Sequence, residues 1–498
     1  MVQPSEVKYR VISSLKWSAV GRIGAQAVSW VVTLVIVRLL SPGDYGLMAS
    51  AMVVVGFAML IHELGIIPAL INAKEVHSGL IRQCLGFVIL LNVALFGLVY
   101  GTASWCGAFF EEASLVPVIQ VLAVTLLINA ASSVPSALLR RQIDFKSLSI
   151  VGMIAGIAGS ATSLGMAFTG AGVWALVGGQ VVGRIVNTVG VLWVSPERWL
   201  PSFRFAGLGS HLRYGATVTG QRLLSHLNSQ ADVIIIGKLL GTTQLGVYFV
   251  AVQVSFLPIS KLVPLLNLVA FPAFSRLQED AELAGNYFLR AVRIALFITI
   301  PMLWGLSAVA HDFVTVIMGP TWTPAIPLLE VIAFAAPVAV AMLMLPPLLN
   351  GMGRPDIGLQ NAVTSIVVVP TCILIGLQWG LIGASFGFAA GYTILTAINL
   401  WRSLGVIRAG LWDFVVTVWP VVCAGALMYG IVKSVDHLLL SGLDPLPKLA
   451  LLVLTGVAAY GMAALTLCRS IFRDLNAIRQ MPKNPDALPV VPPDQSIA

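Results

Sequence analysis

The sequence predicts an all-helical polytopic membrane protein with about 14 transmembrane helices, and two observations predict it. Of the 498 residues, 58% are hydrophobic and only 10% are charged, and the mean hydropathy is +0.93. Soluble domains carry about a quarter charged residues, so this chain has too few to cover a soluble surface. The hydrophobic residues also gather in runs of roughly 20, which is long enough to cross about 30 Å of hydrocarbon. A soluble enzyme, a nucleic-acid binder and a transmembrane β-barrel are therefore excluded.

The hydrophobic runs give the expected spans in chain order. They cover residues 17–40, 46–71, 84–104, 115–138, 148–169, 173–194, 214–239, 246–270, 291–312, 325–349, 359–379, 381–401, 413–433 and 448–468. Prolines within these runs, such as Pro337 and Pro346, mark expected kinks and helix ends. The tail at 471–498 is polar and proline-rich, so we expect it to be disordered.

The distribution of Lys and Arg sets the expected orientation, because cytoplasmic loops carry the excess of positive charge. With the N-terminus inside, the inner loops hold most of these residues, including Arg140, Arg141 and Lys146. The opposite loops, such as Glu111-Glu112 and 311–323, are almost bare of positive charge. We expect both termini to be cytoplasmic. The net charge of +8 arises from Lys and Arg that cluster in short loops between the spans. We therefore expect membrane lipids as partners and no nucleic acid.

A self-match at a constant offset of 200 residues indicates an internal repeat. The run R-L-L-S-P-G-D-Y-G at 38–46 corresponds without a gap to K-L-L-G-T-T-Q-L-G at 238–246. A weaker match pairs G-V-W-A-L at 172–176 with G-L-I-G-A at 380–384. Six expected spans separate the copies, an even number, so both copies enter the membrane in the same direction.

The repeat predicts the domain organisation. Residues 1–200 form an N-lobe of helices 1–6, and residues 201–410 form a C-lobe of helices 7–12. Residues 411–470 add helices 13 and 14, and 471–498 form the disordered cytoplasmic tail. Transporters built from parallel repeats bind substrate between the repeats, so we expect a central cavity there.

Polar residues form stripes on three of the expected helices. Helix 1 carries Arg22, Gln26 and Ser29 at a spacing of i, i+4 and i+7, which places them on one face. The remaining members are Arg222, His226, Ser229, Gln230 and Asp232 on helix 7, and Gln180 and Arg184 on helix 6. A buried Arg in the membrane costs about 2.5–3.5 kcal/mol on insertion scales, so such residues normally face protein or water. The stripes therefore predict the walls of one cavity.

The three arginines have a functional and a structural interpretation. As functional groups, Arg22, Arg222 and Arg184 bind an anion, and a phosphate suits the geometry of the guanidinium best. In the structural alternative, Arg22 and Arg222 extend to the cytoplasmic interface, and Arg184 bridges helices of its lobe. Asp232 either pairs with Arg222 or His226 structurally, or couples transport to H⁺ or Na⁺. Glu63 also has two interpretations: it couples transport to H⁺ or Na⁺, or its side chain extends to the cytoplasmic interface.

The sequence predicts no metal site and no cofactor. The five cysteines are widely spaced and form no CxxC or Cys/His ligand pattern. No pair of residues at a catalytic spacing is evident, so we do not expect an enzyme.

Several segments together resemble a known family. They are L-K-W-S-A-V-G-R at 15–22, V-R-L-L-S-P-G-D-Y-G-L at 37–47, H-E-L-G-I-I-P-A-L-I at 62–71, V-P-S-A-L-L-R-R-Q-I-D-F at 134–145 and G-x-G-V-W-A-L-V at 170–177. This combination is similar to the polysaccharide exporters of the multidrug/oligosaccharidyl-lipid/polysaccharide flippase superfamily, and in particular to the colanic-acid and xanthan type.

The resemblance implies a multi-pass flippase of the bacterial cytoplasmic (inner) membrane. Such proteins move undecaprenyl-pyrophosphate-linked oligosaccharide repeat units to the periplasmic leaflet for exopolysaccharide synthesis, by alternating access through a cationic cavity. It also implies H⁺ or Na⁺ as the driving ion, and the polymerase and chain-length proteins of the same pathway as partners. A helix-1 arginine contributes to the cavity of lipid II flippases, and Arg22 matches its location.

Two other functions remain open at this stage. An ion-coupled multidrug antiporter of the same superfamily would favour acidic and aromatic cavity residues, whereas the charges within these spans are mainly positive. A membrane-embedded repeat-unit polymerase would need a long loop or an extramembrane domain, and no loop between the expected spans exceeds roughly 20 residues.

Overall fold

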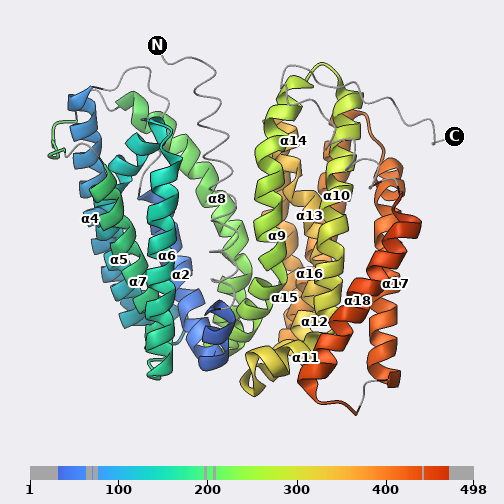
Figure 1. Ribbon diagram of the computed structural model, residues 1–498. Helices are drawn as coiled ribbons and strands as arrows, with labels where there is room; N and C mark the ends of the chain where they lie inside the picture. The colour runs from blue at the N-terminus through green and yellow to red at the C-terminus, as the bar shows by residue number, and fades with distance from the viewer. Residues whose placement is uncertain are drawn as a thin grey trace. The chain divides into compact units, whose positions relative to one another are not determined.

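The computed structural model describes residues 32–62, 70, 77–195, 199–205, 209–439, 442–469 and 471, apart from some side chains between 209 and 272 and that of residue 439. Every regular element within these ranges is a helix (Figure 1). This confirms the expected fold class.

The helices follow the expected spans closely. From 46–71 to 448–468, each expected span overlaps one long helix or, at 325–349, three short helices. The span 291–312 also extends into α11 and 359–379 into η3, and residues 63–69 of the span 46–71 lie outside the described residues. The elements in chain order are α2 (Pro42–Ile61), α4 (Ser78–Phe109), α5 (Leu115–Arg141), α6 (Phe145–Phe168), α7 (Val173–Val194), α8 (Gly209–Leu240), α9 (Thr242–Arg276), α10 (Ala281–Ala308), α11 (Ala310–Phe313), η1 (Val314–Met318), η2 (Pro320–Ala325), α12 (Ile326–Ala335), α13 (Pro337–Leu343), α14 (Leu345–Gly351), α15 (Pro355–Gly376), η3 (Leu377–Trp379), α16 (Gly380–Leu404), η4 (Gly405–Ile407), α17 (Leu411–Leu439) and α18 (Pro445–Leu467).

Ten stretches of the described chain are long and apolar enough to cross a membrane, or eleven if the pair bent by 47° between Pro320 and Gly351 is one span. One of the ten, Pro355–Ile407, contains both α15 and α16. These two helices fold back on each other: a Cβ on Gly376 would lie 2.1 Å from the carbonyl oxygen of Gly383. The protein is therefore a multi-pass membrane protein. The total of 14 spans and the location of the termini stay predictions.

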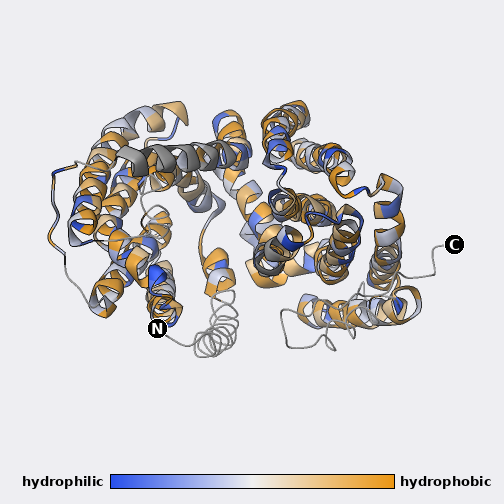
Figure 2. Ribbon diagram, turned by 90° about the horizontal axis from the view of Figure 1, so that it is seen from above, coloured by the Kyte–Doolittle hydropathy of each residue, from blue (hydrophilic) through white to orange (hydrophobic). Residues whose placement is uncertain are grey.

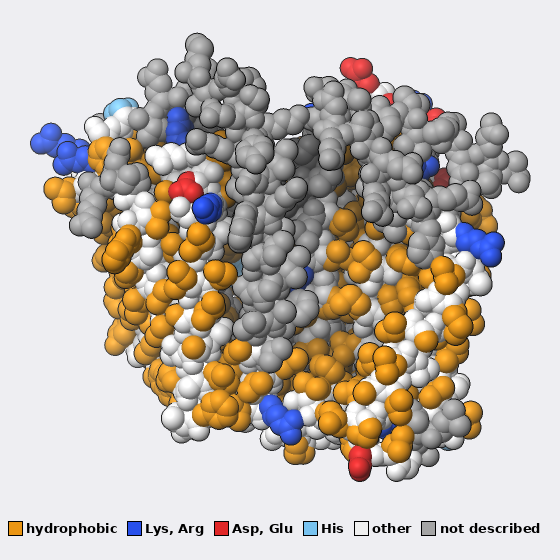
Figure 3. Space-filling model, viewed as in Figure 1, with side chains coloured by type: hydrophobic (Ala, Val, Ile, Leu, Met, Phe, Trp, Pro, Cys, Tyr) orange, Lys and Arg blue, Asp and Glu red, His pale blue; other side chains and the backbone are white. Residues whose placement is uncertain are grey.

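The outer faces of the helices are apolar. Hydrophobic residues occur on all sides of most helices in Figure 2, as expected where lipid replaces water. In Figure 3 they cover the middle of the helices, and most of the charged side chains in view lie near the helix ends. Trp193 is 84% exposed and Trp412 is 75% exposed, values that suit contact with lipid.

The first of two compact units contains Met1–Val254, His311–Ile332 and Gln360–Gly391. Its core is built on α5, where Leu115, Ile119, Leu122 and Leu126 are completely buried at helical spacing. Around this stripe α5 packs against α2, α4 and α7, and α6 packs against α7.

The second compact unit contains Ser255–Ala310, Ala333–Leu359 and Tyr392–Ala498. In this unit α10 packs against α17 and α18. The ring of Phe334 stacks on Trp304 with centroids 4.7 Å apart, and Tyr460 donates a 2.8 Å hydrogen bond to the carbonyl of Phe297. An ion pair of 2.6 Å between Lys448 and Asp436 joins α17 to α18.

The backbone conformation agrees with both sequence matches of the repeat. The chain is helical from 32 to 39, breaks at Ser41 and begins α2 at Pro42; it breaks at Gly241 and begins α9 at Thr242. Gly172 and Gly380, which the weaker match pairs, both adopt a positive φ at the start of a helix. The lobe boundaries at 200 and 410 rest on the repeat and stay a prediction.

Candidate functional site

The predicted site residues divide into two groups. Arg22, Gln26, Ser29 and Glu63 lie outside the described residues, as does the side chain of Arg222, whose backbone belongs to α8. The side chains of the other predicted residues are described and belong to the first compact unit. They are Gln180 and Arg184 on α7, and His226, Ser229, Gln230 and Asp232 on α8.

The stripe on α7 is fixed by contacts to two neighbouring helices. The amide nitrogen of Gln180 donates to the sulfur of Met52 on α2 at 3.4 Å. On an adjoining face, the hydroxyl of Thr188 lies 3.1 Å from that of Ser132 on α5 and donates to the carbonyl of Ile128. These contacts set the rotation of α7, and Arg184 is exposed.

The position of Arg184 within α7 restricts what the side chain can reach. The helix runs from Val173 to Val194, which places Arg184 near its middle. At 1.5 Å per residue, either end of the helix is about 15 Å away. An Arg near a helix end can extend to the interface, but one at this depth normally faces protein or a water-filled cavity.

The stripe on α8 approaches the same helix that Gln180 contacts. The ring of His226 packs edge-on against Phe57 of α2, with centroids 4.9 Å apart. Its Nε2 also faces Gly56, since a Cβ on that glycine would lie 2.8 Å away. Met52 and Gly56 are one turn apart on α2 and share a face. Gln180 and His226 therefore meet the same side of α2.

The polar groups beyond His226 differ in their exposure. Ser229 is exposed and donates to the carbonyl of His226 at 2.9 Å, whereas Gln230 is half-buried. The Nε2 atom of His226 is buried and has no hydrogen-bond partner among the described groups. A buried polar atom without a partner is costly in an apolar interior, so this nitrogen is a candidate contact for a polar ligand.

Asp232 has a partner that the sequence did not indicate. The hydroxyl of Tyr248 on α9 donates to one carboxylate oxygen at 3.0 Å, and the backbone N–H of Val233 donates to the other at 2.9 Å. Tyr248 is completely buried and packs edge-on against Phe388 of α16, with centroids 6.2 Å apart. Among the described side chains the partner is thus a tyrosine hydroxyl. The expected pair with His226 does not form, and the pair with Arg222 lies outside the described residues.

Comparison with known proteins identifies the family. The polysaccharide biosynthesis protein family matches residues 35–327, which is more than half of the chain. The chain belongs to this family.

Two relatives of this polysaccharide biosynthesis family member match most of its length. The lipopolysaccharide biosynthesis protein WzxC of Escherichia coli is 23% identical over 83% of this chain and 85% of its own. The teichuronic acid biosynthesis protein TuaB of Bacillus subtilis is 24% identical over 92% of this chain and 95% of its own. The expected resemblance to polysaccharide exporters is thereby confirmed.

The fold has also been observed in a solved transporter structure. The lipid II flippase MurJ in an inward closed conformation superimposes with a TM-score of 0.74, covering 92% of this chain and 99% of its own. Only 13% of the residues are identical, so the likeness concerns the fold alone. This member of the polysaccharide biosynthesis family thus shares the helical fold of that structure.

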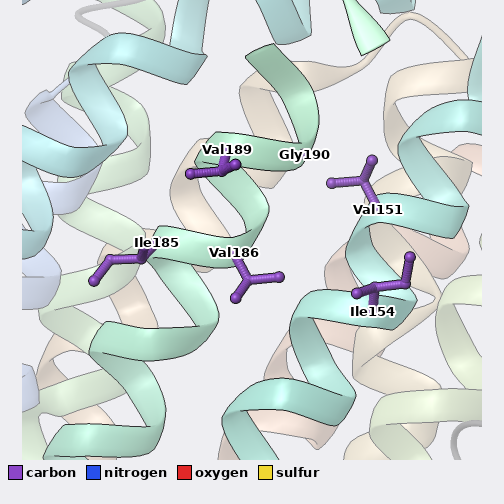
Figure 4. Close-up of a pocket in the computed structure, with 6 residues that line it drawn as sticks. All are labelled: Val151, Ile154, Ile185, Val186, Val189 and Gly190. Atoms are coloured by element: carbon purple, nitrogen blue, oxygen red, sulfur yellow. The ribbon is translucent and has the colours of Figure 1, made fainter. Parts of the chain in front are cut away.

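A separate cavity in this family member has apolar walls, unlike the polar stripes on α7 and α8. It measures about 260 Å³ and lies between α6 and α7 (Figure 4). Val151, Ile154, Ile185, Val186, Val189 and Gly190 line it, so its walls offer no polar side chain. Such walls do not suit a sugar or a phosphate. No group of three metal-ligating side chains occurs in the described part of the chain.

Proposed function

We propose that this protein is a flippase for undecaprenyl-pyrophosphate-linked oligosaccharide repeat units. It moves them from the cytoplasmic to the periplasmic leaflet of the bacterial inner membrane, for exopolysaccharide synthesis, by alternating access through a cationic central cavity. One observation carries the proposal: the polar faces of α7 and α8 meet one side of α2, with the exposed guanidinium of Arg184 at mid-span.

The chemistry of the substrate explains why such a lining is needed. A pyrophosphate is anionic and a sugar carries many hydroxyl groups, and neither crosses hydrocarbon without compensation. A guanidinium binds phosphate oxygens through parallel, charge-assisted hydrogen bonds. Arg184, together with Arg22 and Arg222, would hold the pyrophosphate. Gln26, Ser29, Gln180, His226, Ser229 and Gln230 would replace water around the sugar, while the polyprenyl tail stays in lipid.

The proposed energy source is an ion gradient that acts at Asp232, with Glu63 as the second candidate. The contact between Asp232 and Tyr248 supports this role, because it joins a carboxylate on α8 to α9. A carboxylate that changes its protonation or binds Na⁺ also changes its bond to the tyrosine hydroxyl, and therefore the contact between the two helices. The polymerase and chain-length proteins of the same pathway are the proposed protein partners.

The alternatives are a multidrug antiporter and a membrane-embedded polymerase. A binding site for organic cations favours carboxylates and aromatic faces, whereas the stripe on α7 presents an arginine. A polymerase requires reacting groups at a catalytic distance from each other, and the loops between the helices are short. Both alternatives predict a different lipid phenotype from a flippase.

The deciding experiment locates the lipid-linked oligosaccharide in a strain that lacks this protein and in which polymer synthesis is blocked. Undecaprenyl-linked units are labelled with a periplasmic probe that cannot cross the membrane, and then extracted. We expect complete repeat units that the probe does not reach, because they stay on the cytoplasmic face. A strain that lacks only the polymerase is the control, since its units should be labelled.

Each alternative has its own outcome. Complete units that are labelled in the absence of this protein would contradict a flippase and favour a polymerase or assembly role. Normal polymer output from the deletion strain, combined with a raised sensitivity to cationic drugs, would favour the antiporter. Re-expression of the intact chain should restore the export of units only if the protein is a flippase.

A further inference from the structure

The two copies of the repeated segment contact each other through equivalent residues. A Cβ on Gly46 of α2 would lie 1.7 Å from the carbonyl oxygen of Thr242, the first residue of α9. A Cβ on Gly246 of α9 would lie 1.7 Å from the carbonyl oxygen of Pro42, the first residue of α2. The offset of 200 residues exchanges the two members of each pair, so the contact has local two-fold symmetry. The main chains touch, and only glycine fits at either position.

The cationic side chains just before the two helices are equivalent in the repeat, but their partners are not. Arg38 of the first copy donates to the carbonyl of Val316, in the segment that follows α11. Lys238, its equivalent in the second copy, forms a 2.7 Å ion pair with Glu111, in the segment that follows α4. Each cation therefore reaches a turn that belongs to the opposite predicted lobe.

Neighbouring groups strengthen the contact between Lys238 and Glu111. The Nζ of Lys238 lies 5.5 Å from the centre of the Phe109 ring, and the hydroxyl of Thr242 donates to Glu112 at 3.3 Å. The hydrogen bond and the charge of Lys238 lower the pKa of Glu111, so this carboxylate is charged at neutral pH. The Glu111 side chain is 79% exposed, which lets water hydrate it when the pair separates.

A buried aromatic residue strengthens the contact between the segment of Arg38 and the segment of Val316. Trp322 is completely buried, and its indole N–H donates to the carbonyl of Val37 at 2.8 Å. The ring also packs edge-on against Tyr45 with centroids 5.5 Å apart. The contact around Arg38 and Trp322 thus combines apolar burial with hydrogen bonds. The contact around Lys238 and Glu111 depends on an exposed ion pair. The ion pair is the part of the contact that is easier to open.

We propose that these contacts form a latch between the two repeats, which closes the periplasmic end of the substrate pathway and must open before the substrate can leave. The latch consists of Arg38 with Val316, Gly46 with Thr242, Gly246 with Pro42, and Lys238 with Glu111. All of these residues belong to one compact unit. They lie just before and at the starts of α2 and α9 (Figure 1), in the turn after α4 and in η1. The periplasmic location follows from the predicted orientation of Glu111 and 311–323, and the role in release rests on the proposed function.

The first test measures the latch without any transported substrate. Spin labels at Ala113 and Gln244, which are both exposed, report the distance between the two sides in the purified full-length protein. We expect Lys238→Ala to increase the population of the longer distance about two- to fivefold, the range for losing one exposed ion pair. Lys448→Ala is the matched control, because it removes another outer ion pair that lies within the α17–α18 hairpin. An unchanged distribution in Lys238→Ala would overturn the latch.

The second test asks whether opening is required for transport. Glu111→Cys and Lys238→Cys are combined after the five native cysteines are replaced, and a short reducible reagent links the pair. We expect the linked protein to lose export of lipid-linked units and to regain it on reduction. The pair Asp436→Cys and Lys448→Cys, linked in the same way, should export normally. Equal export by both linked proteins would overturn the role of the latch in release.

The two tests separate the latch from the proposed substrate. If the unlinked protein moves no lipid-linked oligosaccharide, the proposed function fails, and the spin-label distances still decide whether the latch opens. A Glu111→Lys and Lys238→Glu double substitution adds a check, because it restores the attraction that either single substitution replaces with repulsion. Recovery of the short distance in the double variant supports the latch, and failure to recover it contradicts the role of the ion pair.

Discussion

Arg184 is the only arginine or lysine among the described side chains of the predicted stripes. Its helix is held by Gln180 against α2 and by Thr188 against α5, so the rotation of α7 does not depend on Arg184 itself. A residue that does not hold its own helix in place can be replaced without loss of the fold. A substitution at Arg184 therefore changes the charge without disturbing the packing of α7, which makes this position suitable for testing anion binding.

We expect Arg184→Ala to reduce the export of lipid-linked oligosaccharide about 10- to 100-fold, since hydrogen bonds to charged groups contribute about 1.5–3 kcal/mol. Arg184→Lys should keep the charge but lose the parallel bonds to phosphate, and should retain intermediate export. Polymer output per unit of protein in the membrane measures both variants. Arg204→Ala, in the exposed loop before α8, is the control and should export normally. Full export by Arg184→Ala would show that Arg184 does not bind the pyrophosphate.

Asp232 is the residue at which coupling to an ion can be tested. Asp232→Asn keeps an oxygen that accepts the hydrogen bond from Tyr248 and removes the charge that H⁺ or Na⁺ would neutralise. We expect the variant to accumulate in the membrane normally, and its transport in proteoliposomes to become independent of the imposed ion gradient. Tyr248→Phe, which leaves the carboxylate in place but removes the hydrogen bond that joins it to α9, should weaken the gradient dependence without abolishing it. A gradient response like that of the intact protein in Asp232→Asn would assign Asp232 a structural role.

At the scale of elements, the ends of the helices decide how the repeats meet. α2 begins with Ser41 as N-cap, Pro42 in the first turn and Asp44 completing a capping box with Ser41. These groups fix the direction of the first turn of α2, and α9 begins at the equivalent position after Gly241. The two first turns can then touch through Gly46 and Gly246, because neither helix carries a side chain there.

We expect Gly46→Ala to destabilise the protein by about 1–3 kcal/mol, the typical effect of placing an extra carbon in a packed site. The new Cβ meets a backbone carbonyl, which cannot turn aside as a flexible side chain does. The midpoint of thermal unfolding in detergent measures the effect. Gly101→Ala on α4 is the matched control: its Cβ would meet no atom within 4 Å, so the higher helix propensity of alanine should leave stability unchanged or slightly raised. Equal midpoints for the two variants would contradict the close contact.

At the scale of the whole molecule, hydropathy predicted the helices because the bilayer fixes their length and composition. The expected span at 173–194 coincides with α7. The expected span at 325–349 divides into α12, α13 and α14, and the later two have prolines in their first turns, at Pro337 and Pro346. The prolines predicted a kink in this span, and the bend of 47° at Pro337 confirms it. The angle itself was not predicted, because it depends on the neighbouring helices that pack on each piece.

The site was predicted less completely than the helices. Periodicity placed Gln180 and Arg184 on one face of α7, but it could not show that Met52 and Gly56 of α2 would bring Gln180 and His226 together. Tyr248 was missed because its bond to Asp232 forms between two helices, and no spacing along the chain encodes that contact. The repeat showed that Gly46 and Gly246 are equivalent, but equivalence alone does not show that the two residues touch.

The orientation of the chain in the membrane is the prediction on which the pathway and the latch both depend. Single cysteines at Glu111 and Asp444, in turns predicted to be periplasmic, should react with an impermeant maleimide in intact cells. Cysteines at Gln142 and Glu279, in turns predicted to be cytoplasmic, should react only after the membrane is permeabilised. All four positions are exposed, so a difference in reaction reports the side of the membrane and not burial. The opposite pattern would place the latch at the cytoplasmic end, where it would control entry of the substrate and not its release.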